Sequence, residues 1–186
     1  MQPSPMLASS SNPHRAARLH ALIPCAGSGS RAQTATPKQY QPLAGQPLVL
    51  HTLSAFAQVS RLASVLVVVA PDDEVLVAVS GLAVARCGGD TRAASVRNGL
   101  RELLKAGAHE DDWVLVHDAA RCLLTPVMVD ALIDACQDDP VGGLLAQPLA
   151  DTLKQEAQGR SSSTLPREGK WPHPQALRAQ SVCQVS

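Results

Sequence analysis

Aromatic side chains are scarce in this 186-residue sequence, where Phe, Tyr and Trp together make up 2% of the residues. The four aromatic residues are too few to form the platform on which single-stranded nucleic acids stack. An excess of charge of either sign is also missing, because 16 Lys and Arg residues balance 16 Asp and Glu residues. The sequence therefore lacks the basic footprint of a nucleic-acid-binding protein.

Paired cysteines and long apolar runs are missing as well. The five cysteines are scattered, with no Cys-x-x-Cys pair and no metal-type spacing with the histidines. We interpret them as reduced thiols of a cytoplasmic protein. Cys25 and Cys122 lie near candidate loops, but neither has a local histidine that would activate it as a nucleophile. No apolar run reaches transmembrane length, so we expect no membrane association.

The amino-terminal segment, residues 1–18, differs in composition from the rest. It is rich in Ser, Pro, Ala and Arg, and it contains neither an acidic residue nor the apolar core of a secretory signal. We expect a disordered extension. An organellar transit peptide also fits the composition, although the segment is short and interrupted by prolines. The remainder is long enough for one domain, and 45% hydrophobic content suffices for its core.

From residue 19 the sequence alternates between predicted strands and helices, which indicates an α/β fold with a doubly wound, mainly parallel sheet. Thr91 and Thr125 are candidate N-caps, and Pro126 follows the second as a first-turn proline. The acidic run 110–112 is interpreted as a solvated turn before a strand. Strands are predicted at 19–23, 64–70, 82–86, 113–117 and 142–146, and helices at 47–59, 91–106 and 125–137.

The most informative segment follows the first predicted strand and reads PCAGSGSR over residues 24–31. Gly27 and Gly29 allow the backbone to approach a ligand closely and to direct N–H groups at anionic oxygens. Arg31 and Lys38 add two cations, which suit a phosphorus centre that gains negative charge. An ordinary turn with solvated cations is the alternative. A dinucleotide-binding loop also fits the glycine spacing, but Pro37 would break the helix that such a fold requires.

Three unusual loops follow predicted strands, and we expect them to converge on one cleft because parallel strands end at the same edge. One of these loops reads VHDAAR over residues 116–121. Asp118 in it is a candidate ligand for Mg²⁺ beside substrate phosphates. A turn aspartate that pairs with Arg121 is an equally good interpretation.

Five motifs occur in order: residues 24–31, PKQY at 37–40, GGDTRAASV at 88–96, VHDAAR at 116–121 and DTLK at 151–154. Together, over about residues 21–171, they resemble the 2-C-methyl-D-erythritol 4-phosphate cytidylyltransferase family. The resemblance implies a nucleotide-diphospho-sugar transferase-like fold with a protruding arm. It also implies a reaction in which the phosphate of methylerythritol phosphate attacks the α-phosphorus of CTP and releases pyrophosphate.

The same resemblance implies a role for individual residues. For Ser95, an ordinary helix-surface serine is the alternative interpretation. The implied set is catalytic Arg31, Lys38 and Arg167; CTP-binding Ala26, Gly27, Gly29, Gly89, Asp90 and Ser95; acceptor-binding Arg121 and Thr152; and Asp118 as the ligand of a divalent cation, Mg²⁺.

The resemblance further divides the chain into the extension, a nucleotide-binding domain at 19–148, an arm at 149–171 and an atypical tail at 172–186. By itself the segment 149–171 indicates a flexible loop, whereas the family's arm crosses to a second subunit and implies a homodimer. The tail departs from the family pattern, so we expect the family's carboxyl-terminal segment to be lacking. The alternatives are a ribitol 5-phosphate cytidylyltransferase, an inactive nucleotide-binding fragment and, more weakly, a dinucleotide-binding oxidoreductase.

Overall fold

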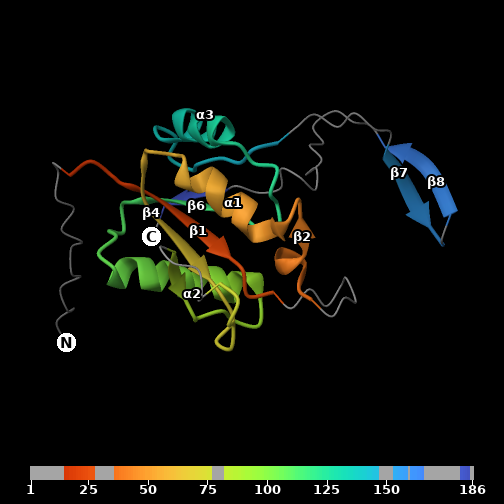
Figure 1. The fold of residues 1–186 in the computed structure, drawn as a ribbon. Coiled ribbons are helices and arrows are strands. Elements are labelled where there is room, and N and C mark those ends of the chain that lie inside the picture. The colour runs from red at the N-terminus through yellow and green to blue at the C-terminus, as the bar shows by residue number, and fades with distance from the viewer. Residues whose placement is uncertain are drawn as a thin grey trace, which may run out of the picture.

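The computed structural model describes residues 15–27, 36–76, 82–146, 153–158, 160–165 and 181–184. Its centre is a five-stranded sheet in the order β5-β4-β1-β6-β9 (Figure 1). β1 (Leu19–Pro24) pairs in parallel with β4 (Leu62–Val68) and β6 (Trp113–Val116), and β4 pairs in parallel with β5 (Ala83–Ala85). The chain winds outward from β1 to β5 and then returns to β6 on the other side of β1. The prediction of a doubly wound, mainly parallel sheet is confirmed.

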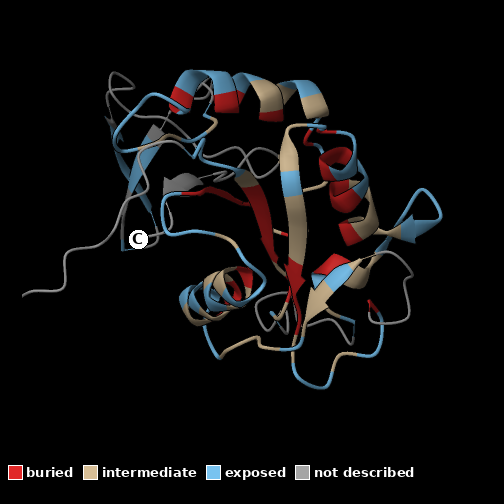
Figure 2. Cartoon of the chain, turned by 90° about the vertical axis from the view of Figure 1, so that its left-hand side faces the viewer, coloured by how far each residue is buried: buried red, intermediate tan, exposed pale blue. Residues whose placement is uncertain are grey.

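Helices cover both faces of this sheet. α1 (Leu48–Ala57) and α3 (Pro126–Cys136) lie on one face, and α2 (Arg92–Lys105) lies on the other (Figure 1). Buried residues therefore form two clusters, one around Ile23 and Phe56 and the other around Leu22 and Leu103 (Figure 2). Burial on both faces explains why β1 is continuously apolar in its centre, without the alternation of a half-exposed strand.

The predicted helix caps are confirmed. The Thr91 hydroxyl oxygen accepts a hydrogen bond from the Ala94 N–H at 3.0 Å, and Thr125 does the same for the Met128 N–H at 3.3 Å. Each hydroxyl satisfies one of the backbone donors that have no partner in the first helical turn. Pro126 occupies that turn of α3, where its missing N–H costs nothing.

The prediction of a fifth strand at residues 142–146 is wrong. This stretch contains only an isolated bridge at Leu144. Gly142 has a φ of 85°, which no extended strand can contain, and its N–H joins that of Val141 in a turn around the Asp139 carboxylate. The edge of the sheet beside β6 is instead formed by β9 (Ser181–Gln184), which pairs antiparallel and comes from the tail 172–186.

Two small antiparallel sheets lie outside the central one. β2 (Pro42–Leu43) and β3 (Gln46–Pro47) form a short hairpin before α1. β7 (Leu153–Ala157) and β8 (Arg160–Leu165) form a second hairpin within the segment where we expected an arm. This second hairpin stands apart from the sheet in Figure 1, and its described side chains between Lys154 and Thr164 are exposed.

A buried carboxylate lies at the amino end of the parallel strands. Asp112 immediately precedes β6, and its side chain is fully buried. Both of its oxygens are paired with the Arg15 guanidinium, at 2.8 and 2.9 Å, and they also accept from the backbone N–H groups of Arg18 and His109. The interpretation of 110–112 as a solvated turn is therefore wrong for Asp112, because partners distant in the sequence enclose it.

Hydrogen bonds also connect Asp112 to a histidine and a serine. His20 Nε2 lies 3.2 Å from the Asp112 carboxylate, and His20 Nδ1 lies 2.8 Å from Ser64 Oγ. The three residue types are those of a hydrolytic triad, but none of them lines the pocket described below. The carboxylate is already engaged by Arg15 and by backbone donors. We therefore interpret this network as structural: it ties residues 15–18 and β1 to the start of β6.

The environment of Asp112 keeps the carboxylate ionised. Burial by itself would raise its pKa, but the hydrogen bonds from Arg15, His109 and Arg18 outweigh burial and hold the pKa well below its usual value. A carboxyl group whose pKa falls on folding stabilises the folded state above its unfolded pKa of about 3.9, and this stabilisation disappears as the pH falls below that value.

We predict that Asp112→Asn lowers the free energy of unfolding at pH 7 by about 3 kcal/mol, because it leaves buried donors without an anionic acceptor. Chemical denaturation from pH 7 to pH 3 measures the effect. The difference between wild type and variant should shrink as the pH falls below about 4, where the wild-type carboxylate loses its advantage. Asp138→Asn, which changes an exposed aspartate, is the matched control. Equal stability of Asp112→Asn and wild type at pH 7 would contradict the structural role that we assign to the Asp112 carboxylate.

Candidate functional site

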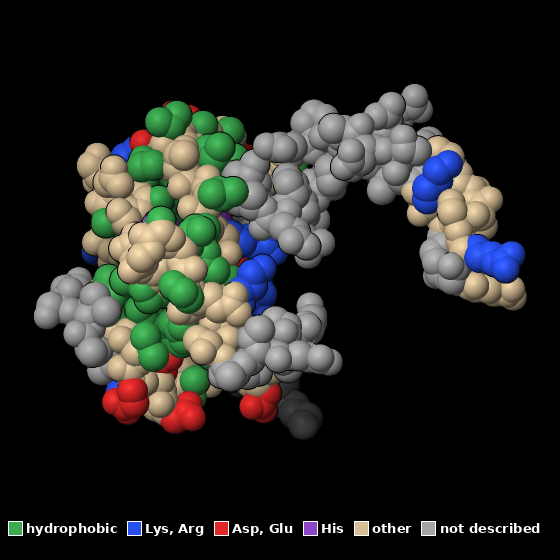
Figure 3. Space-filling model, turned by 45° about the vertical axis from the view of Figure 1, so that its right-hand side comes forward, with side chains coloured by type: hydrophobic (Ala, Val, Ile, Leu, Met, Phe, Trp, Pro, Cys, Tyr) green, Lys and Arg blue, Asp and Glu red, His purple; other side chains and the backbone are tan. Residues whose placement is uncertain are grey.

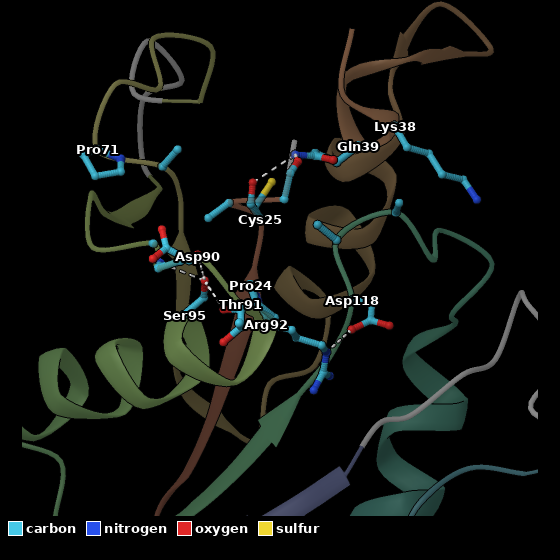
Figure 4. A pocket seen from close by; sticks show the side chains of 17 residues that line it. Pro24, Cys25, Lys38, Gln39, Pro71, Asp90, Thr91, Arg92, Ser95 and Asp118 are labelled. Atoms are coloured by element: carbon cyan, nitrogen blue, oxygen red, sulfur yellow. Dashed lines mark hydrogen bonds and ion pairs between the residues drawn. The ribbon is translucent and has the colours of Figure 1, made fainter. Parts of the chain in front are cut away.

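A pocket of about 760 Å³ lies at the carboxyl ends of the four parallel strands. Its walls come from residues 24–27 at the end of β1, 70–71 after β4, 88–92 at the start of α2, and 118–120 after β6, together with 38–39 and Ser95. The chain reverses its winding direction between β1 and β6, and open α/β sheets bind ligands at such a point. The predicted convergence of the loops on one cleft is thus confirmed (Figure 4).

Most of the predicted site residues within the described part of the chain line this pocket. Arg121 is not part of the lining, but it contacts the pocket through an ion pair with Asp118. Gly29, Arg31, Thr152 and Arg167 lie outside the described residues. The predicted site residues that line the pocket are Ala26, Gly27, Lys38, Gly89, Asp90, Ser95 and Asp118.

Close packing between two loops requires glycine at position 88. A Cβ atom there would overlap the Ala26 methyl group and would lie 2.7 Å from the Val69 carbonyl oxygen. The Gly88 N–H donates to that same carbonyl at 2.8 Å. The loop after β5 is therefore bonded to the residue that follows β4 and packs closely against Ala26 in the loop after β1, and Gly88 and Ala26 both line the pocket.

Ser95 fixes the next part of the loop. The Gly89 N–H donates to Ser95 Oγ at 3.0 Å, and the serine hydroxyl lies 3.1 Å from the Thr91 carbonyl oxygen, to which it donates. Ser95 is 3% exposed, so the interpretation as an ordinary helix-surface serine is wrong. Its hydroxyl holds Gly89 and Asp90 at the pocket wall (Figure 4).

Two guanidinium groups hold the Asp118 carboxylate. Arg92 Nε lies 2.7 Å from Oδ1, and Arg121 Nε lies 2.6 Å from Oδ2. The ion pair with Arg92 joins α2 to the loop after β6 across the pocket (Figure 4). On the surface, Lys and Arg side chains gather on the side of the domain nearest the β7–β8 hairpin (Figure 3).

Buried polar contacts support the Asp118 loop from behind. The Thr52 hydroxyl on α1 donates to the Ala119 carbonyl at 2.9 Å, and His117 Nε2 donates to the Arg121 carbonyl at 2.9 Å. His117 packs against Phe56, and burial lowers its pKa, which keeps the imidazole neutral at pH 7. His117 Nδ1 has no hydrogen-bond partner among the described residues, which agrees with a neutral ring that carries its proton on Nε2.

Cys25 lies in the pocket wall, but its environment does not suit a nucleophile. The thiol is buried beside the Tyr40 hydroxyl, and burial raises its pKa to about 12. A thiol with so high a pKa carries almost no thiolate at neutral pH. The structure thus agrees with the expectation that Cys25 takes no covalent part in the chemistry.

Two pocket residues, Gln39 and Arg92, received no role from the sequence. Gln39 is 7% exposed, and its amide contacts the backbone of the glycine segment. Arg92 begins α2, where the helix dipole disfavours a cation. The sequence could have identified Arg92 as a candidate site residue, because it places a positive charge at the start of a predicted helix whose first turn has no acidic residue.

Comparison with known proteins identifies the family to which this chain belongs. A family model for 2-C-methyl-D-erythritol 4-phosphate cytidylyltransferase matches residues 19–185. The chain belongs to this cytidylyltransferase family. The match extends beyond Trp171 through most of the segment 172–186, where we expected an atypical tail, and this segment supplies β9 of the sheet.

Individual relatives agree with the family assignment. A bifunctional IspD/IspF enzyme from Albidiferax ferrireducens is 62% identical over 158 residues, which are 83% of this chain and 38% of the relative. A 2-C-methyl-D-erythritol 4-phosphate cytidylyltransferase from Paraburkholderia phymatum is 53% identical over 161 residues, which are 83% of this chain and 68% of the relative. A crystal structure of 4-diphosphocytidyl-2C-methyl-D-erythritol synthase matches with a TM-score of 0.78 and 36% identity, and covers 92% of this chain and 76% of that one.

The chain thus spans less than half of the bifunctional relative and about two thirds of the single-function one. Among the helices that the structure describes, none has both the length and the apolarity needed to cross a membrane.

Proposed function

We propose that this protein transfers the cytidylyl group of CTP to 2-C-methyl-D-erythritol 4-phosphate and releases pyrophosphate. The observation that carries the proposal is the pocket itself, which combines closely packed loop backbone, cations and the carboxylates of Asp90 and Asp118 in a chain of the cytidylyltransferase family. An oxygen of the acceptor phosphate attacks the α-phosphorus of CTP, and the bond from that phosphorus to the pyrophosphate oxygen breaks. In such a displacement the protein contributes positioning and charge stabilisation.

Lys38 is the cation that we assign to the triphosphate. It lies on the 3₁₀ helix η2 (Lys38–Tyr40), its side chain is exposed, and it borders the pocket. A cation fixed at this place stabilises the charge that accumulates on the departing pyrophosphate. Arg31 is proposed as its catalytic partner. Arg167 is proposed to orient the acceptor together with Arg121 and Thr152.

The opposite wall of the pocket is the proposed nucleotide-recognition surface. Gly89 and Asp90 present carbonyl and carboxylate oxygens, which suit the N4 amino group of cytosine because that group is a hydrogen-bond donor. Ser95 holds this part of the loop through its bonds to Gly89 and Thr91. Ala26, Gly27 and Gly29 are assigned to backbone contacts with the phosphates.

Asp118 is the residue to which we assign Mg²⁺. Its carboxylate borders the pocket and is one-quarter exposed. Within the described residues, no cluster of three or more His, Cys, Asp or Glu side chains could hold a metal ion. A single carboxylate fits Mg²⁺ whose other ligands are water and nucleotide phosphates, and the bound ion would neutralise charge on those phosphates. Because Arg92 and Arg121 engage both carboxylate oxygens, the nucleotide is needed for the ion to bind.

A homodimer is proposed on two observations. Within the described part of the chain, the β7–β8 hairpin pairs with no strand of the central sheet, and an isolated two-stranded hairpin is marginally stable in water. In addition, large apolar side chains near α3 are exposed, among them Leu123 at 62% and Val127 at 77%. Contact with a second copy would bury both features, as the family resemblance implies for the arm. We propose a cytoplasmic location for this enzyme.

The proposed reaction predicts that the chain releases pyrophosphate from CTP only when Mg²⁺ and methylerythritol phosphate are present. A coupled pyrophosphate assay, run also with ribitol 5-phosphate and with no acceptor, measures this. Release with ribitol 5-phosphate alone would assign the alternative acceptor, and no release from folded protein would reject the enzyme assignment.

We expect Lys38→Ala to lower turnover by roughly 100-fold or more, because it removes charge stabilisation at the triphosphate. Lys105→Ala, which removes a remote exposed lysine, is the control.

The metal assignment predicts that Asp118→Asn raises the Mg²⁺ concentration needed for half-maximal CTP binding by roughly tenfold. Calorimetric titration of CTP at several Mg²⁺ concentrations measures the shift. The same titration of Mg²⁺ without nucleotide should show no binding at Asp118. Asp138→Asn should behave as wild type. An unchanged Mg²⁺ requirement in Asp118→Asn would remove this residue as the ligand.

The dimer proposal predicts a species of twice the chain mass at micromolar concentration. Sedimentation velocity measures it. Replacement of the exposed apolar side chains Leu123 and Val127 by Ser should shift the population toward the monomer, because less apolar area is buried on association. A wild-type chain that sediments as a monomer over the whole range would refute the proposal.

A further inference from the structure

The side-chain amide of Gln39 contacts the backbone of the glycine segment twice. Its Nε2 lies 3.0 Å from the Cys25 carbonyl oxygen and 2.8 Å from the Gly27 carbonyl oxygen. An NH₂ group has two protons, so it donates to both carbonyls at once. The bond to Cys25 spans 14 residues of the chain and the bond to Gly27 spans 12, so together they link η2 to the segment that follows β1.

The direction of these carbonyls determines where an adjacent amide points. In a trans peptide the carbonyl oxygen and the following N–H lie on opposite sides of the bond. Since Gln39 holds the Cys25 carbonyl, the N–H of Ala26 points away from Gln39. Ala26 lines the pocket, and no residue in the described part of the chain accepts a hydrogen bond from its N–H. A backbone N–H that borders a pocket and has no acceptor in the protein is available to an anionic oxygen.

Gln39 is itself held in place by the next residue. The Tyr40 hydroxyl donates a hydrogen bond to Asp73 Oδ2. The other oxygen of Asp73 accepts from the Val75 and Leu76 N–H groups, each at 3.1 Å. η2 is therefore fixed on one side to the glycine segment and on the other to the loop after β4.

We propose that Gln39 is a positioning residue that turns the Ala26 N–H toward the pocket as a donor for polyphosphate oxygens. The same residue fixes the distance between this donor and Lys38, its neighbour on η2. Gln39 touches neither reacting atom, so its effect on a ligand passes through the backbone of residues 25–27. The inference rests on the proposed function in one respect, which is that the polyphosphate is the triphosphate of CTP.

The test compares Gln39→Met with wild type, because methionine keeps the approximate volume and loses both donors. The ¹⁵N-labelled full chain is titrated separately with CTP, inorganic tripolyphosphate and cytidine, and amide chemical shifts are followed by NMR. In wild type, the Ala26 amide should shift with CTP and tripolyphosphate. In Gln39→Met, the affinity for both should fall about tenfold while the affinity for cytidine stays within about twofold of wild type.

Gln58→Met is the matched control, since the Gln58 amide donates to a backbone carbonyl on the exposed end of α1. It should bind all three ligands as wild type does. Equal loss of cytidine and tripolyphosphate binding in Gln39→Met, or no loss at all, would overturn the positioning role. If Gln39→Met does not fold, an Ala26 amide in wild type that is unaffected by tripolyphosphate would overturn it equally.

The outcomes also separate this inference from the proposed function. Wild type that binds tripolyphosphate through Ala26 but does not bind CTP would reject the nucleotide assignment, and weaker tripolyphosphate binding in Gln39→Met would then still support the role of Gln39. Normal CTP turnover in Gln39→Met would support the enzyme assignment and overturn the role of Gln39.

Discussion

The parallel pairing of β1 with both β4 and β6 is the constraint on which the pocket depends. Strands that run in the same direction end at the same edge, so the loops that follow them meet even though they are far apart in sequence. The segments 24–27, 70–71 and 118–120 become neighbours in this way. Burial of β1 on both faces then makes the bases of these loops rigid, because apolar side chains pack against them from either side.

Charges in the pocket are compensated unevenly. Asp118 already shares its oxygens with Arg92 and Arg121, whereas Lys38 forms no ion pair with any residue that the structure describes. An anionic ligand therefore meets a cation with unused capacity, while a metal ion must compete with two guanidinium groups. On our proposal for Asp118, the nucleotide phosphates would give Arg92 and Arg121 new partners, which would leave the carboxylate available to a metal ion.

Most features that depend on neighbours in sequence could be predicted, although the local turn at 139–142 was missed, and features that depend on distant partners could not be predicted. The caps at Thr91 and Thr125 and the loop positions at strand ends follow from local chemistry. Asp112 is buried because partners distant in the sequence enclose it, among them Arg15, which is 97 residues away. The failed strand at 142–146 has an apolar composition that suits a strand, but the Asp139 turn and the positive φ of Gly142 decide its conformation. The carbonyl contacts of Gln39 likewise require the fold.

The contacts that stabilise the fold and the contacts that shape the pocket lie at opposite ends of the same strands. At the amino ends, Asp112 and His20 join β6 to β1 through buried polar contacts that no pocket residue shares. At the carboxyl ends, Asp118 and Gln39 hold loops through contacts that a ligand can compete for or use. Although β1 has only six residues and β6 only four, the two ends use separate sets of partners. A change in a loop at the carboxyl edge therefore does not involve the contacts that join β6 to β1 at the other end.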